Sequence, residues 1–364
     1  MFYAKLMKTD LQTKTAIGRG ALSNAVGRFD GLTRHGEDDG WDQSEPLPVL
    51  RTQVSIERPR SLISYNRSPD LPFDRSINPY RGCEHGCVYC FARPSHAYLG
   101  MSAGLDFETK LIARPDAPEV LRTELGKRSY NVAPIAIGTN TDPYQPIEKE
   151  HGIMRACLEV LEDCGHPVAI VTKGALIERD IDILGRMARR GLVRVGISVT
   201  TLDAKLSRLM EPRAPAPARR LAVIRRLSEA GIPVRIMASP MVPALSDPEL
   251  ESILSQGKAC GARTASWIML RLPQEVSPLW QEWLAQHYPD RAARIMARLR
   301  EMHGGQDYDA RWGHRMRGEG PYAQMIAARF SLAIKRLGLK ERAPAMRTDL
   351  FQKPVSDSAQ LTLF

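Results

Sequence analysis

The sequence predicts an α/β protein built around a mostly parallel sheet, and two observations support that fold class. From about Pro134 onward, short apolar runs alternate with amphipathic helical patterns in units of roughly thirty residues. The runs are rich in β-branched residues and apolar nearly throughout, as strands buried on both faces are. Repeated strand–helix units with short loops imply a parallel sheet that is either doubly wound or curled into a barrel.

Six strands are expected in chain order. A short segment at 76–80 is the first, and the others are the apolar runs 133–139, 167–173, 193–200, 233–240 and 265–272. Helical patterns such as 150–165 and 219–231 separate them, and the second of these ends on a glycine that suits a helix C-cap.

Composition along the chain predicts four parts. Turn formers and mixed charges before residue 76 indicate an irregular extension, and two amphipathic patterns near the carboxyl end, 278–302 and 321–338, predict helices. We expect an irregular N-terminal extension over 1–75, an α/β core over 76–275, a C-terminal helical region over 276–346 and a flexible tail over 347–364.

The net charge of +10 and the isoelectric point near 9.4 suggest an acidic partner such as nucleic acid. Arginine supplies most of the clustered charge, in the runs 186–191, 216–226, 291–300 and 311–318. Any one of these runs could instead be the solvated outer face of a helix. Aromatic residues near the last two runs, Trp280, Trp283, Tyr288 and Trp312, could stack on bases or could simply pack between helices.

The location of the protein is inferred from features that the sequence lacks. No apolar run approaches the length of a membrane span, and the amino terminus has no apolar signal core, so we expect a cytoplasmic protein without a membrane partner. Six cysteines are too few for a disulfide framework in 364 residues, and we expect reduced thiols.

Three of those cysteines, Cys83, Cys87 and Cys90, lie within eight residues of polar, glycine-containing chain. Such spacing lets one loop surround a soft metal centre, since thiolates select zinc or iron–sulfur clusters. A structural zinc ion takes four ligands, and the fourth could be His85, although it stands only two residues after Cys83. In a four-iron cluster, three thiolates would leave one iron open for chemistry.

The motif CEHGCVYC at 83–90 resembles the signature of the radical S-adenosylmethionine (SAM) superfamily, and the resemblance covers about 76–273. It implies a partial (β/α)6 barrel of the TIM-barrel type. It also implies a [4Fe–4S] cluster held by Cys83, Cys87 and Cys90, with SAM bound at the open iron. An electron donor would reduce the cluster, and cleavage of SAM would give methionine and a 5′-deoxyadenosyl radical.

Within the superfamily the chain is most similar to the spore photoproduct lyase-like branch, also labelled DNA repair photolyase. The matching blocks are NPYRGCEHGCVYCFAR, TDPYQPIE, VTKG, GISVTTLD and EPRAPAPARRL. The resemblance implies that the cofactor is bound by Tyr89, Phe91, Thr141, Asp142, Lys173, Ser198 and Ala238. Lys173 would pair with the methionine carboxylate. Taken alone, each of these residues could be an ordinary surface or core residue.

One position departs from the branch. Where the lyase has a cysteine that returns a hydrogen atom to the product radical, this chain has Thr139, whose O–H bond is much harder to break homolytically. We therefore expect a radical SAM enzyme of nucleic-acid repair or modification that is not a true spore photoproduct lyase, and no catalytic residue beyond the cluster is assigned. The alternative is a metal-stabilised nucleic-acid-binding protein without SAM chemistry.

The last five residues, QLTLF, begin at Gln360 and end at Phe364. They resemble the short peptide through which bacterial replication and repair proteins bind the sliding clamp, in which a glutamine, leucines and a final phenylalanine fill an apolar groove. The alternative is a tail that docks on its own domain. An apolar pentamer after a polar stretch is unusual because chain ends tend to be polar.

Overall fold

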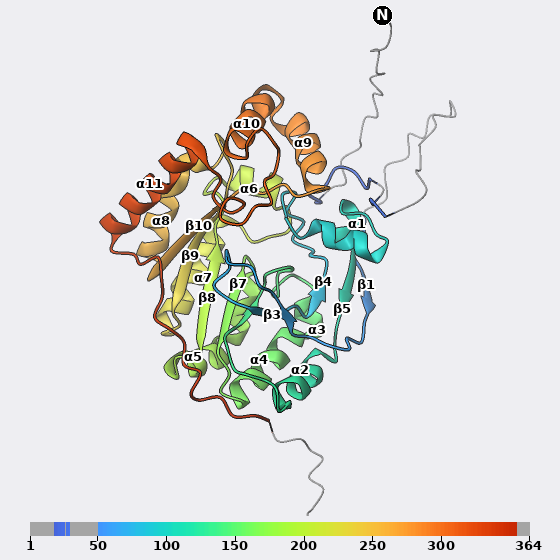
Figure 1. The fold of residues 1–364 in the computed structure, drawn as a ribbon, viewed down its shortest axis with the longest axis vertical. Coiled ribbons are helices and arrows are strands. Elements are labelled where there is room, and N and C mark those ends of the chain that lie inside the picture. Colours follow the sequence, from blue (N-terminus) through green and yellow to red (C-terminus); the bar gives the residue numbers. More distant parts are fainter. Residues whose placement is uncertain (1–17, 26, 30–49, 355–364) are drawn as a thin grey trace, which may run out of the picture.

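The computed structural model describes residues 18–25, 27–29 and 50–354 (Figure 1). A seven-stranded sheet has the strand order β10-β9-β8-β7-β6-β3-β2, and a separate three-stranded sheet has the order β1-β5-β4. The strands are β1 (Gln53–Ile56), β2 (Ser64–Tyr65), β3 (Arg75–Ile77), β4 (Tyr80–Arg81), β5 (Lys110–Ala113), β6 (Ile135–Ile137), β7 (Val168–Thr172), β8 (Val193–Ser198), β9 (Val234–Met241) and β10 (Thr264–Met269).

The helices follow the predicted alternation with the strands. They are η1 (Arg93–Leu99), α1 (Leu105–Thr109), α2 (Ala117–Gly126), α3 (Glu148–His151), α4 (Ile153–Asp163), η2 (Ala175–Asp180), α5 (Ile181–Arg189), α6 (Ala204–Met210), α7 (Pro217–Glu229), η3 (Asp247–Glu249), α8 (Leu250–Ala259), α9 (Val276–His287), α10 (Pro289–Met302) and α11 (Gly320–Leu337). None of these helices has the combination of length and apolar character that crossing a bilayer requires.

The six predicted strands are confirmed as β3, β6, β7, β8, β9 and β10, and neighbouring members of this set run parallel. The short strand β2 pairs antiparallel with β3 at one edge. Strands β7 and β8 consist largely of buried β-branched residues, as a sheet covered on both faces requires. Helix α8 approaches β9 closely at Gly257, where an added Cβ would lie 2.7 Å from the side chain of Ile236.

Part of the segment 1–75, expected to be irregular, belongs to the two sheets. Strand β1 pairs parallel with β5, and β2 pairs with β3. Residues 50–75 therefore extend both sheets, because the edges of β5 and β3 offer unpaired backbone groups that these short segments satisfy. The stretch at 18–24, which is mostly buried, packs beside the cysteine loop and is described with the site below.

The C-terminal helical region differs from the sequence prediction at one point. The pattern 278–302 forms two helices, α9 and α10, because Pro289 starts α10 and the preceding Tyr288 is not helical. The second predicted helix, 321–338, is confirmed as α11.

The described part of the predicted tail, 347–354, lies against the protein as the end of a C-terminal strap that we define as residues 339–354 (Figure 1, red). The strap crosses the amino-terminal ends of the strands: Lys340 bridges to Thr264 at the start of β10, Arg347 donates to Gly191 before β8, and Gln352 donates to Cys164 before β7. The aromatic ring of Phe351 packs against Tyr130 and His166, an anchor that the polar surroundings concealed in the sequence.

Candidate active site

The cysteine loop follows β4 and lies at the carboxyl ends of the parallel strands. Cys83 and Cys87 are buried and Cys90 is half-buried. All three line a cavity of about 100 Å³ whose other walls come from the ends of β6, β7 and β8. The remaining lining residues are His85, Phe91, Gly138, Thr139, Asn140, Thr141, Asp142, Val171, Thr172, Lys173 and Ser198. Residues from four distant segments thus meet at one edge of the sheet, where ligands bind in parallel α/β folds.

The spacing of the three sulfur atoms bears on the zinc site that the sequence left open. A tetrahedral zinc ion with bonds of about 2.3 Å needs ligand atoms roughly 3.8 Å apart. Within the described residues, the only three His, Cys, Asp or Glu ligand atoms that all lie within 4.8 Å of one another belong to Asp309, His314 and Glu319, and Arg311 already forms ion pairs with two of these. The three cysteine sulfur atoms do not all fall within this range of one another, so the structure does not gather them around a single tetrahedral ion.

His85 is held by a partner other than the cysteines. Its Nδ1 lies 3.3 Å from a carboxylate oxygen of Asp142. That carboxylate also accepts hydrogen bonds from the Thr172 hydroxyl at 2.5 Å and the Lys173 backbone N–H at 2.7 Å. Burial alone would raise the pKa of Asp142, but the His85 charge and these donors hold it well below its usual range. Asp142 thereby ties the cysteine loop to the end of β7.

A buried ion pair supports the cysteine loop from behind. Arg93 is fully buried and donates to the Cys87 carbonyl at 2.9 Å, to the carbonyls of Ala103 and Gly104, and to Glu108. An arginine with this many backbone acceptors fixes the path of the loop, because moving it would leave several buried polar groups unpaired.

The N-terminal segment completes this support. The backbone N–H groups of Gly20 and Ala21 each donate to the Glu108 carboxylate at 2.9 Å. Gly20 also packs against the backbone of Gly86, inside the cysteine motif, so closely that an added Cβ would lie 1.8 Å from the Gly86 oxygen. The sequence analysis missed this contact because more than sixty residues separate its two sides.

Lys173, the predicted partner of the methionine carboxylate, lies directly after β7. Its ammonium is mostly buried, 4.0 Å from Glu211 and 5.7 Å from the centre of the Tyr89 ring. Burial would lower the pKa of Lys173, but Cys87 and Glu211 raise it above its ordinary value, so the side chain is charged. Within the described residues, Nζ donates no short hydrogen bond, and Lys173 is one of the residues that line the cavity.

The other residues assigned to the cofactor fall into two groups. Ser198, Thr141, Asp142 and Phe91 line the cavity beside the cysteines. Tyr89 turns away from the cavity and donates to Glu211 in the interior, and Ala238 is fully buried in β9 outside the cavity lining. The structure therefore brings most of the assigned set together, and the contact of each with SAM remains a prediction.

Glu211 and Arg220 are buried residues that the sequence analysis did not assign to the site. Glu211 follows α6, is fully buried and forms an ion pair with Arg220 of α7. Burial would raise the pKa of Glu211, but the charges of Arg220 and Lys173 lower it to about 2. Their sequence signal was weak, because Arg220 belongs to an arginine run that could equally have been a solvated helix face.

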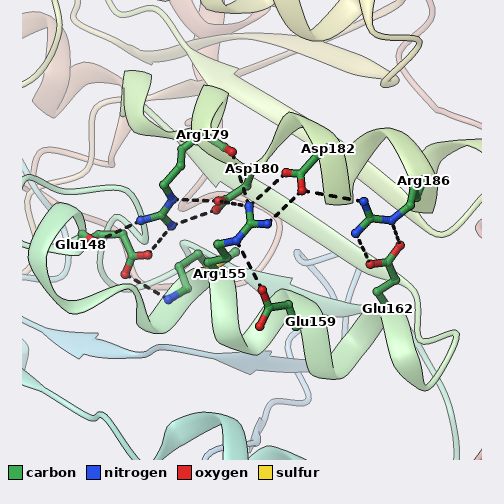
Figure 2. A network of polar contacts seen from close by, with 9 residues as sticks. Glu148, Arg155, Glu159, Glu162, Arg179, Asp180, Asp182 and Arg186 are labelled. Carbon is green, nitrogen blue, oxygen red and sulfur yellow. Dashed lines mark hydrogen bonds and ion pairs between the residues drawn. The ribbon is translucent and has the colours of Figure 1, made fainter.

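The arginine runs themselves are largely engaged in ion pairs. Figure 2 shows Arg186, from the run 186–191, forked onto Glu162 with two bonds of 2.7 Å, beside Arg155 on Asp182. Arg219 forks onto Glu178 in the same way, and Arg226 donates one hydrogen bond to that carboxylate. These pairs favour the interpretation of the runs as outer helix faces, and the net charge alone does not locate a binding surface.

The aromatic residues of the C-terminal region also separate. Trp280 and Trp283 are fully buried and stack on each other at 4.8 Å, so they pack the helices and do not stack on bases. Trp312 is 61% exposed. At the cavity mouth, Phe91 is 46% exposed and carries the guanidinium of Arg271 at 4.2 Å from its ring centre.

Comparisons with known proteins agree with this geometry. Residues 77–256 match the family model described as Radical SAM superfamily. An uncharacterised protein of Mycobacterium tuberculosis is 37% identical over 235 residues, which cover 64% of this chain and 68% of the relative. An uncharacterised protein of Methanocaldococcus jannaschii is 25% identical over 214 residues, 59% of this chain and 76% of that one.

Solved structures of spore photoproduct lyase share the fold. The lyase complexed with dinucleoside spore photoproduct superposes with a TM-score of 0.56 at 15% identity, over 78% of this chain and 79% of that chain. A lyase variant with bound AdoMet and the same dinucleoside gives a TM-score of 0.54 over the same shares, also at 15% identity. At this identity the likeness concerns the fold alone.

Proposed function

Because the chain belongs to the radical SAM superfamily, whose members are enzymes that use a [4Fe–4S] cluster and SAM, we propose that it repairs or modifies nucleic acid by radical chemistry. The six parallel strands form an open sheet among the described residues, and we infer that it curves into the partial barrel of that superfamily.

The residues present fit these cofactors. The thiols of Cys83, Cys87 and Cys90 would hold the cluster, and the burial of Cys83 and Cys87 limits the access of water to it. Burial raises the pKa of Cys87 to about 12, so loading the site must release protons. When bound and reduced by an external electron donor, the cluster supplies the electron that cleaves SAM to methionine and a 5′-deoxyadenosyl radical.

The protein side chains bind and orient the amino-acid part of SAM in this proposal. A zwitterion held in a half-apolar cavity needs a cation and hydroxyl donors, because unpaired charge is costly away from water. Lys173 supplies the cation and Ser198, which lines the same cavity, supplies a hydroxyl donor. The Thr141 hydroxyl donates to the Tyr80 carbonyl at 3.1 Å and is left to accept from the ligand. Asp142 orients the cavity wall by holding the Lys173 backbone and the Thr172 hydroxyl.

The observation that supports an acidic substrate is the state of Arg271. It follows β10, with its guanidinium 4.2 Å from the ring centre of Phe91, which lines the cavity, and burial lowers its pKa from the ordinary value. Within the part of the chain that the structure describes, its guanidinium has no hydrogen bond and no ion pair, unlike the arginines of the outer helices. A half-buried guanidinium with free donors suits a phosphate oxygen, and the net charge of +10 favours a polyanion.

Thr139 supports a reaction other than that of spore photoproduct lyase. It lines the cavity where that branch has its hydrogen-donating cysteine, and the three cysteines of the loop are the only thiols among the lining residues. A product radical in this cavity would need a hydrogen source other than a thiol of the protein.

The test uses the full chain, reconstituted without oxygen, with reductant and SAM. Perdeuterated RNA and perdeuterated DNA, untreated or ultraviolet-irradiated, are supplied in turn, and 5′-deoxyadenosine is analysed by mass spectrometry. We expect deuterium in 5′-deoxyadenosine with at least one nucleic acid. If 5′-deoxyadenosine forms but never carries the label, the substrate is not nucleic acid. If none forms, the alternative of a metal-stabilised binding protein replaces the enzyme.

The same assay with R271Q examines the observation behind the proposal. Losing a charged hydrogen bond of about 1.5–3 kcal/mol should raise KM for the nucleic acid about tenfold or more. The unlabelled background of 5′-deoxyadenosine should not change. R298Q is the matched control, because Arg298 is an exposed α10 arginine paired with Glu301. Equal KM for R271Q and R298Q at fixed salt would contradict a role for Arg271.

We propose the sliding clamp as a partner of the last five residues, from Gln360 to Phe364, which lie outside the described residues. The strap supports this arrangement, because it leads the chain to Pro354 near Gly126, at the sheet end opposite the cavity. We expect a labelled AQLTLF peptide to bind purified clamp in fluorescence anisotropy and to be displaced by a known clamp ligand. Binding that this ligand does not compete, or no binding, would contradict the proposal.

A further inference from the structure

Glu211 connects residues of four separate elements at the base of the cavity. Its carboxylate accepts hydrogen bonds from the Tyr89 hydroxyl and from the Thr200 hydroxyl at 2.8 Å, and it forms an ion pair with Arg220. The Lys173 ammonium lies 4.0 Å away. These partners come from the cysteine loop, the segment after β8, helix α7 and the end of β7.

The two cations of this group do not approach Glu211 equally closely. Glu211 is the acceptor for two buried cations, but Arg220 contacts it directly, whereas Lys173 lies at the outer limit of an ion pair. Arg220 is fully buried and also donates to the carbonyls of Pro215 and Ser198. Arg220 therefore neutralises Glu211, and the charge of Lys173 is left for an anion in the cavity.

Glu211 also links this lysine to the metal loop. Tyr89 stands between Cys87 and Cys90, and its hydroxyl is held by Glu211 and Thr200 while its ring lies beneath the Lys173 ammonium. A single buried carboxylate thus fixes Tyr89 directly, fixes Lys173 by attraction and fixes Ser198 through Arg220. A rigid buried network of this kind sets the distance between groups that must meet one ligand.

We propose that Glu211, held by Arg220, is a positioning residue that aims Lys173 at the carboxylate of SAM and keeps it in register with the cysteine loop. This inference rests on the proposed function, because it takes SAM as the ligand of the cavity. Glu211 itself is buried behind Lys173 and Tyr89 and does not line the cavity, so it acts through these two residues.

The test is the double variant E211Q/R220Q in the full chain. Replacing both members leaves the net charge unchanged and leaves neither Glu211 nor Arg220 as an unpaired buried charge, so the protein is expected to fold. Lys173 and Tyr89 then lack their anchor. We expect normal iron and sulfide content, but a Kd for SAM at least tenfold higher in equilibrium dialysis with the oxidised cluster. We also expect a smaller change in the electron paramagnetic resonance spectrum of the reduced cluster when SAM is added.

The matched control is E249Q. Glu249 accepts from the Thr201 hydroxyl at 2.5 Å and the Leu202 backbone at 3.0 Å, in the same loop after β8, without contact to Lys173 or Tyr89. It should bind SAM like the unaltered protein. The single variant E211D keeps the charge but has a shorter side chain. Its Kd for SAM should therefore lie between that of the unaltered protein and that of E211Q/R220Q.

The outcomes separate the two proposals. If the unaltered protein loaded with iron binds no SAM, the proposed function fails. If the unaltered protein binds SAM and E211Q/R220Q binds it equally well, the positioning role fails. If E211Q/R220Q does not retain iron, the E211D variant decides: iron-loaded E211D with unchanged affinity and an unchanged spectrum would also overturn the role.

Discussion

Alanine in place of Cys83, Cys87 or Cys90 is expected to abolish cluster binding and, with it, all formation of 5′-deoxyadenosine. Three thiolates are the whole protein share of a site-differentiated cluster, so two cannot hold it against solvent and oxygen. The loop contains no other thiol that could substitute, since the three remaining cysteines lie elsewhere. The measurements are iron and sulfide content after anaerobic reconstitution, absorption near 400 nm, and 5′-deoxyadenosine by chromatography.

Two variants make this expectation specific. C157A removes a buried thiol of α4 that lies outside the cavity, and it should keep iron and activity. H85N tests whether His85 is a fourth ligand that occupies the open iron of the cluster. Because His85 Nδ1 is paired with Asp142, we expect H85N to lose stability but keep its iron. An H85N protein that folds without iron, or a C87A protein that still forms 5′-deoxyadenosine, would contradict the assignment of the ligands.

The strands could be predicted because their signal is local. The run 193–200 is rich in β-branched residues, and all but one of the residues that form β8 are buried, as in a strand covered on both faces. Helix ends were harder to predict, because a local amphipathic period can continue across the end of a helix. The pattern 278–302 keeps its amphipathic period across Pro289, so periodicity alone could not reveal the break between α9 and α10.

The cavity could be predicted in part because the ends of parallel strands meet at one edge. The cysteine motif follows one predicted strand and Lys173 is the last residue of another. The structure places both in the lining of one cavity. Tyr89 shows where this logic ends. It stands between Cys87 and Cys90, two of the proposed metal ligands, but its side chain points into the interior, and no sequence pattern gives the direction of a side chain in an irregular loop.

The buried charges could not be predicted because each depends on a distant partner. Arg219 and Arg220 are adjacent in one arginine run, yet Arg219 binds Glu178 on the surface and Arg220 binds Glu211 in the interior. Adjacent helix positions point about 100° apart, so one side chain can face solvent and the next the core. Composition treats both arginines alike, and only the packing of α7 on β8 and β9 distinguishes them.

The variant G20A is expected to destabilise the protein by about 3 kcal/mol or more and to impair cluster assembly. The added Cβ would lie 1.8 Å from the Gly86 oxygen and 3.3 Å from the Val88 nitrogen. Both are backbone atoms of the cysteine motif, so no side chain can move aside. Separating the two segments costs about 1–3 kcal/mol for overpacking. It also weakens the hydrogen bonds of Gly20 and Ala21 to buried Glu108, each worth a further ~1 kcal/mol.

Urea unfolding followed by tryptophan fluorescence measures the first effect, and iron content after reconstitution measures the second. The matched control is G185A in α5, where the nearest atom to an added Cβ is 3.8 Å away. Alanine is the better helix former there, so G185A should be neutral or stabilising by up to about 1 kcal/mol. Because Gly20 touches the metal loop only through backbone, G20A should lose iron in proportion to its loss of stability. A G20A protein as stable and as rich in iron as G185A would mean that the N-terminal segment does not support the cluster.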